Sequence, residues 1–183
     1  MTPLELRHFL LNWNKNRLDK LAPAMISEFK NAPERWNGLH EIAITKAEYP
    51  FQEYASWLCG HLTDEFYLNH NPKRMAQVVD AWLITENQSV RRNLLKIMLA
   101  VPSQHRSGEV LDRLLHNISS PNEAIAVRSY SFHMLMNFLK EHPDLRYEID
   151  TIIDSFPELF KVPAIQSCLK RYRKVAGASF WFK

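Results

Sequence analysis

Apolar residues recur at helical spacing along most of the chain, and they predict an all-α protein. Three segments, which follow Pro72, Ser107 and Pro143, place apolar residues at positions i, i+3, i+4 and i+7. This spacing puts the side chains on one face of an α-helix. The three sets are Met75, Val78, Val79 and Trp82; Leu111, Leu114, Leu115 and Ile118; and Ile149, Ile152, Ile153 and Phe156. We expect all three sets to be core, with Leu39, Ile42 and Ala43 as a weaker fourth.

A second helix follows each of these segments, and the second helices align with one another. Ser89-Val90-Arg91 corresponds to Ala126-Val127-Arg128, with Leu94 matching Ser131 and Met98 matching Leu135. The period is about 37 residues, which is typical of stacked helical repeats. One helix pair cannot bury its apolar face alone, whereas stacked pairs form a continuous core. The sequence therefore predicts an α-α superhelix of about five helix pairs.

The predicted domain organisation is one helical-repeat domain over residues 1–183. Residues 1–32 form either a full repeat or a divergent N-terminal cap, and residues 176–183 form an aromatic C-terminal tail. Only four glycines occur, which favours helices over folds that need many tight turns. The two cysteines, Cys59 and Cys168, stand inside apolar helical patterns and are expected to be buried free thiols. No apolar run approaches the roughly 18 residues of a membrane span, so we expect a cytoplasmic protein.

The repeat resembles HEAT or armadillo-type repeats, whose second helix opens with a Val-Arg pair after a polar turn. Val90-Arg91 and Val127-Arg128 carry this resemblance. A narrower resemblance links Ala81–Asn87 and the following Val90-Arg91-Arg92 to the bacterial HEAT-like alkylpurine DNA glycosylases. The catalytic aspartate of those enzymes lies in a tryptophan-rich motif of the form Trp-Trp-Asp followed shortly by a second Asp. The nearest stretch here, Ser56–His61, keeps one tryptophan but lacks both aspartates. The resemblance therefore implies the scaffold and not the chemistry.

Arg91 and Arg128 hold equivalent positions in successive repeats, and two roles are open for them. As phosphate contacts they would line a groove. As a structural ladder they would donate hydrogen bonds to carboxylates or carbonyls of an adjacent turn, which is the role that the HEAT resemblance favours.

A basic stripe is the main binding hypothesis. Arg92, Lys96, His133 and Arg171 fall on one side of the aligned second helices. If the second helices line the concave face, the stripe could track a phosphate backbone or an acidic peptide. The alternative is an ordinary solvated helix face.

The C-terminal end mixes cations with aromatic rings. No acidic residue follows Glu158, whereas Lys170, Arg171, Arg173 and Lys174 lie close together. Phe180, Trp181 and Phe182 come next, and they could cover the last repeat, mediate oligomerisation, stack on bases or insert at a membrane surface.

The sequence indicates no catalytic residues, no metal site and no cofactor, because none of its histidines, cysteines, serines or carboxylates stands in a recognised spacing. Three hypotheses follow. The first is a non-enzymatic scaffold that presents a concave surface to a protein or peptide. The second is a nucleic-acid-binding relative of the DNA glycosylases, which binds duplex DNA through the basic stripe. The third is a small-molecule enzyme with a site between helices.

Overall fold

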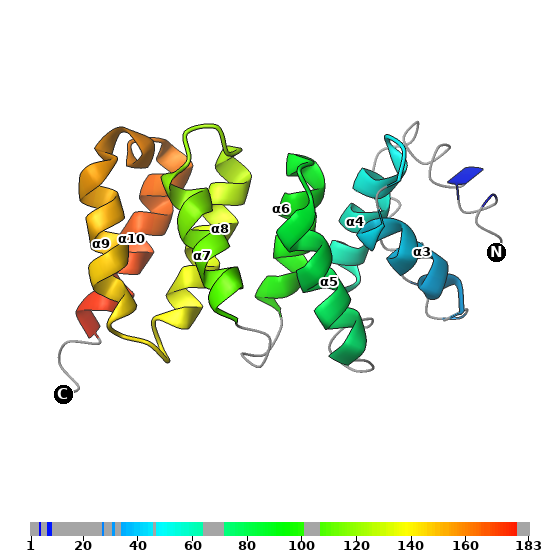
Figure 1. The fold of residues 1–183 in the computed structure, drawn as a ribbon, viewed down its shortest axis with the longest axis horizontal. Helices are drawn as coiled ribbons and strands as arrows, with labels where there is room; N and C mark the ends of the chain where they lie inside the picture. Colours follow the sequence, from blue (N-terminus) through cyan, green and yellow to red (C-terminus); the bar gives the residue numbers. More distant parts are fainter. Residues whose placement is uncertain are drawn as a thin grey trace. The chain divides into compact units, whose positions relative to one another are not determined.

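The computed structural model describes residues 34–45, 47–63, 72–100 and 107–178, together with Leu4, Arg7, His8, Ser27 and Asn31. The described residues form helices and no strands, which confirms the all-α class (Figure 1). The elements are α3 (Glu34–Ile44), α4 (Phe51–His61), α5 (Pro72–Ile84), α6 (Gln88–Leu99), α7 (Gly108–Ser119), α8 (Ile125–Phe138), α9 (Leu145–Ser155), the short 3₁₀ helix η3 (Pro157–Phe160) and α10 (Pro163–Ala178).

The chain divides into two compact units, Met1–His105 and Arg106–Lys183. Each unit contains two of the described helix pairs: α3–α4 and α5–α6 in the first, and α7–α8 and α9–α10 in the second. The sequence predicts that residues 1–183 form a single domain, which would require the two units to join, and this stays a prediction. The expected N-terminal cap and the aromatic tail after residue 178 lie outside the described residues.

The first unit stacks its helices in the manner of a repeat protein. Helix α3 packs on α4 and α5 on α6, while α3 also contacts α5 and α4 contacts α6 (Figure 1). First helices thus lie beside first helices, and second beside second. Helix α6 begins where the Asn87 side chain accepts hydrogen bonds from the backbone N–H groups of Ser89 (3.0 Å) and Val90 (3.2 Å). This cap satisfies two donors that a helix end leaves free.

The core of the first unit follows the predicted pattern. Trp82, Val78 and Leu94 are fully buried, and Met75 is 3% exposed. Both helices of the α5–α6 pair contribute to this core, because Val90 and Met98 of α6 are also buried. Cys59 is a buried free thiol of this core, as predicted.

The second unit repeats the arrangement. Helix α7 packs on α8, α8 contacts α10, and α7 contacts α9, while η3 contacts both α9 and α10. The Ser107 hydroxyl accepts a hydrogen bond from Val110 N–H (3.3 Å) and so caps α7. Phe132 is the centre of an aromatic group, with edge-on contacts to Phe160 and Tyr172 at centroid distances of 5.9 and 5.6 Å. Cys168 is buried and free, as predicted.

One predicted core position is wrong. Phe156 was expected to fill the place of Trp82 and Ile118, but 46% of its surface is exposed. Helix α9 ends one residue earlier, at Ser155, and Phe156 turns the chain (φ −129°, ψ 54°) into η3. The side chain therefore leaves the apolar face of the helix. Ile152 and Ile153, on the same face, are only half-buried.

Candidate binding surfaces

The arginines of the two Val-Arg pairs, Arg91 and Arg128, both donate hydrogen bonds to backbone carbonyls. Arg91 is 6% exposed, and its guanidinium donates from Nε (3.2 Å) and Nη2 (2.6 Å) to the carbonyl of Thr85. Thr85 lies in the turn between α5 and α6, so the side chain closes its own repeat. A guanidinium that donates to a carbonyl in this way supports the turn.

Arg128 also donates to a backbone carbonyl, but the acceptor lies further away in the sequence. It is 4% exposed, and its Nη2 donates to the carbonyl of Leu159 in η3 at 2.6 Å. Burial lowers the pKa of this guanidinium below its ordinary value. The bond ties the start of α8 to the turn of the following helix pair, so Arg91 and Arg128 support different turns.

A basic cluster lies on α4 and α6, and we define it as His61, Arg92 and Lys96. The predicted stripe residues Arg92 and Lys96 are half-buried, and His61, from the preceding second helix, is exposed. The Trp57 ring lies beside the His61 ring at a centroid distance of 4.0 Å. The stem of Lys96 runs close to Gly60, where a methyl group would meet its Cδ atom at 3.6 Å.

Burial and neighbouring positive charge disfavour protonation of Lys96 and His61 in the α4–α6 basic cluster. Burial, and then the charge of Arg92, lower the pKa of Lys96, while burial and then Lys96 lower the pKa of His61. Within the part of the chain that the structure describes, no carboxylate forms an ion pair with any of the three. Like charges held together in this way disfavour their own protonated forms. A bound anion would reverse that effect.

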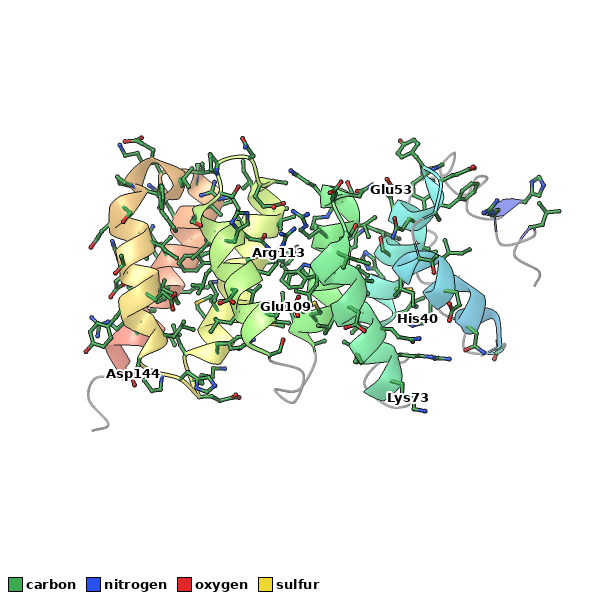
Figure 2. The ribbon with its side chains drawn as sticks, in the orientation of Figure 1. His40, Glu53, Lys73, Glu109, Arg113 and Asp144 are labelled. Atoms are coloured by element: carbon green, nitrogen blue, oxygen red, sulfur yellow. The ribbon has the colours of Figure 1, made fainter. Side chains whose placement is uncertain are left out.

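Asn93 holds Arg92 in position. The amide oxygen of Asn93 accepts from Nε and Nη2 of Arg92, each at 3.2 Å. The amide nitrogen donates across to α4, to the Ser56 hydroxyl (3.0 Å) and the Glu53 carbonyl (3.2 Å). Because Asn93 is only 5% exposed, this bridge is protected from water and fixes the direction of the guanidinium. In Figure 2, Glu53 is labelled on α4, and its carboxylate accepts from the Asn87 side chain at 2.5 Å.

A second group forms between α8 and α10 in the other unit. Arg171 Nη1 donates to His133 Nε2 at 3.3 Å, and the buried Cys168 Sγ lies 3.5 Å from the same nitrogen. The Ser129 hydroxyl lies 3.2 Å from that sulfur. Burial, and then the charge of Arg171, lower the pKa of His133. Sequence reasoning placed His133 and Arg171 on one side of the second helices, and the structure brings these two together.

The remaining predicted cations of α10 face elsewhere. Lys170 and Arg173 line a hollow of about 510 Å³ at α9, η3 and α10. Lys174 is exposed, and Tyr172 is buried with its hydroxyl donating to an Asp150 carboxylate oxygen at 2.6 Å. Burial and this hydrogen bond raise the pKa of Tyr172. A continuous helix turns about 100° per residue, so the basic run is distributed over separate faces.

Sequence reasoning missed His61, Trp57 and Asn93 as parts of a binding surface. The available signal was the 37-residue offset between Ser56 and Asn93, which places two polar residues at equivalent core-facing positions of adjacent second helices. Among the described residues, no group of three histidine, cysteine or acidic side chains is arranged to hold a metal ion. Likewise, no helix in the described ranges is long and apolar enough to cross a membrane.

Comparison with known protein families decides what these paired helices are. A family model described as the HEAT repeat domain matches residues 14–175. The chain belongs to the HEAT repeat family. The Val-Arg pairs of this HEAT repeat protein thus stand where the resemblance placed them, at the start of α6 and α8. No curated protein and no solved structure matched the chain. The narrower likeness to DNA glycosylases stays a hypothesis.

Proposed function

We propose that this HEAT repeat protein is a non-enzymatic scaffold that binds an acidic segment of a partner protein through its second helices, with the α4–α6 basic cluster as a main contact. We expect the second helices to form the concave side of the repeat stack. The observation that carries the proposal is the pair of neighbouring cations Arg92 and Lys96 beside the His61 ring, with which no described carboxylate forms an ion pair. An acidic ligand would supply the missing counter-charge.

Pre-organisation supports a binding role. Arg92 is oriented by the buried Asn93 bridge before any ligand arrives, so less side-chain entropy is lost on binding. The Trp57 ring adds apolar surface next to His61, and such rings contribute strongly to protein interfaces. Charge-assisted hydrogen bonds and apolar contact are the chemistry that these side chains offer.

A comparison of α6 with α8, the second helix of the following repeat, favours a short acidic segment over a long nucleic acid as the ligand. The positions that correspond to Arg92 and Lys96, one period of 37 residues later, are Ser129 and His133 on α8. A surface that tracks a phosphate backbone is expected to present cations in successive repeats. Here the strong positive charge of one second helix is not repeated in the next.

Duplex DNA is the second candidate, and one observation favours it. The α4–α6 basic cluster lies beside the Trp57 ring, which is tilted against the His61 ring. Basic and aromatic side chains together suit nucleic-acid contacts, because the cations bind phosphate and a ring stacks on a base that is extruded from the duplex. The same cluster would then serve a different ligand.

One experiment separates these candidates. Fluorescence anisotropy would measure binding of a labelled glutamate-rich peptide, a neutral peptide of equal length and a labelled duplex, over roughly 50–200 mM salt. The test variant is Arg92→Glu with Lys96→Glu. The control is Lys73→Glu with Lys140→Glu, which makes the same change in net charge at two exposed lysines outside α4 and α6.

We expect the acidic peptide to bind, the test variant to lose that binding, and the control to keep it. Binding of the duplex alone, with a steep salt dependence and loss in the test variant, would replace the acidic partner by nucleic acid. Equal losses in the test and control variants would show a general charge effect and refute this surface.

A further inference from the structure

The hollow of the second unit is built by the turn between α9 and α10. Phe156 and η3 carry the chain away from the end of α9 before α10 begins at Pro163. The α10 residues that line the hollow, Gln166, Leu169, Lys170 and Arg173, follow the i, i+3, i+4, i+7 spacing of one helix stripe. Its volume of about 510 Å³ falls within the ~300–1,000 Å³ of ligand pockets.

The floor of the hollow is apolar. Ile153 from α9, Phe160 from η3 and Leu169 from α10 line it, and Pro157 completes this side. Ile153 and Leu169 are half-buried, so part of each side chain stays uncovered by the described residues. The exposed Phe156 precedes Pro157 directly in the chain. A large apolar side chain would cover this surface and be drawn from water by the hydrophobic effect.

The charged residues of the hollow are unbalanced. Lys161, Lys170 and Arg173 line it with a single carboxylate, Asp154. Lys161 is paired with the exposed Glu158 at 2.7 Å. Within the described ranges, Lys170 and Arg173 have no ion-pair partner. The two free cations project from the same stripe of α10 that supplies Leu169, so positive charge borders apolar surface.

We propose that this hollow, which we call the α9–α10 hollow, binds an acidic peptide segment of a partner protein around one large apolar anchor residue. The anchor occupies the floor at Ile153, Phe160 and Leu169, and carboxylates on either side of it pair with Lys170 and Arg173. Charge complementarity selects this occupant, because a basic segment would be repelled by Lys170 and Arg173 and a neutral one would leave both without an ion-pair partner among the described residues.

This site goes beyond the function proposed above and is separate from the α4–α6 basic cluster. It lies entirely in the second unit, whereas His61, Arg92 and Lys96 lie in the first. It also requires a different peptide. The α4–α6 basic cluster needs only acidic groups, while the hollow needs an apolar anchor between them.

Helix α10 provides a matched control. Lys170→Glu with Arg173→Glu reverses the charge on the hollow side. Arg171→Glu with Lys174→Glu makes the same change on the same helix at residues that do not line the hollow. All four residues are exposed, so both variants are expected to fold, and circular dichroism would verify this.

The test measures anisotropy of labelled peptides with the full chain carrying Arg92→Glu and Lys96→Glu, so that the α4–α6 basic cluster does not contribute to peptide binding. One peptide has a tryptophan between glutamates, a second replaces the tryptophan by serine, and a third replaces the glutamates by lysines. We expect the added Lys170→Glu with Arg173→Glu to weaken the tryptophan peptide by about tenfold or more, and the added control pair to change it by less than about twofold. We expect the serine peptide to bind the chain with an unaltered hollow about tenfold more weakly and the lysine peptide not to bind.

Four outcomes would overturn the proposal: equal losses in both α10 variants, unchanged binding in the hollow variant, equal binding of the serine peptide, or displacement of the tryptophan peptide by a duplex or by anionic lipid vesicles. The variant Arg92→Glu with Lys96→Glu distinguishes the two proposals. It should leave the tryptophan peptide bound, and loss of that peptide in this variant alone would reject the hollow while keeping the α4–α6 basic cluster.

Discussion

Replacing Asn93 by alanine tests both the packing of the first unit and the orientation of its basic cluster. The Asn93 amide makes two donor contacts to α4, at 3.0 Å to Ser56 Oγ and 3.2 Å to Glu53 O, and accepts twice from Arg92. The residue is 5% exposed, so water does not readily replace these bonds. Alanine keeps the helix and removes all four contacts.

The expected cost follows from the type of each bond. Each neutral, buried hydrogen bond contributes about 1 kcal/mol net. The Arg92 contacts are charge-assisted but lie on a half-buried side chain, so solvent reduces their share. The sum is a loss of about 2–3 kcal/mol in the free energy of unfolding. For a unit of about a hundred residues this corresponds to a fall in Tm of roughly 10 °C or more.

Urea denaturation followed by circular dichroism measures this loss, and a double-mutant cycle with Arg92→Ala isolates the Arg92–Asn93 coupling. Lys140→Ala is the control, since it removes an exposed hydrogen bond of 3.3 Å to the Asn137 amide oxygen, and it should cost less than about 1 kcal/mol. We also expect Asn93→Ala to weaken acidic-peptide binding, because Arg92 loses its support. A loss of stability below about 0.5 kcal/mol would refute the buried bridge.

Two further predictions concern α4 and the histidines. Gly60→Ala should stabilise the protein by about 0.5 kcal/mol in the same urea assay, because glycine weakens a helix. The added methyl group meets its nearest neighbours at 3.6–4.0 Å, which is ordinary van der Waals contact. Destabilisation would show that the Lys96 side chain cannot move aside. Acidification from roughly pH 7 to pH 5 should lower the free energy of unfolding. Burial lowers the pKa of His40, His61 and His133 in the folded state. The unfolded chain therefore binds more protons than the folded chain below about pH 6.5, and protonation favours unfolding. The variant His61→Gln with His133→Gln should flatten this slope, and greater stability at the lower pH would contradict the assignment.

The fold was largely predictable because helical repeats are encoded locally. Asn87 and Ser107 cap α6 and α7 through their own side chains, and the apolar spacing within each helix specifies its buried face. Trp82 and Val127 are fully buried as their positions in the pattern require. The exception, Phe156, arises at a helix end, where the chain turns into η3 and helical spacing no longer describes side-chain direction.

The candidate sites were less predictable, because they depend on which residues adjacent helices bring together. Arg92 and Lys96 were identified from one helix, but His61 and Trp57 join them only through the packing of α4 on α6. In the sequence, the basic residues of α10 lie close together, and only Arg171 is also assigned to the basic stripe. The structure assigns Lys170 and Arg173 to the hollow and places Arg171 against His133, since neighbouring residues of a helix point in different directions.

Side chains of α10 point in three directions: toward the hollow, toward His133 and into the core. The helix therefore tolerates a replaced residue better than an inserted or deleted one. Single replacements at Lys170, Arg171 or Arg173 alter one surface and leave the others in place. Inserting one residue near the start of α10 would instead rotate all later side chains by about 100°. Tyr172 would then leave Asp150 and the aromatic contact with Phe132, so a change in register would damage the core and both surfaces at once.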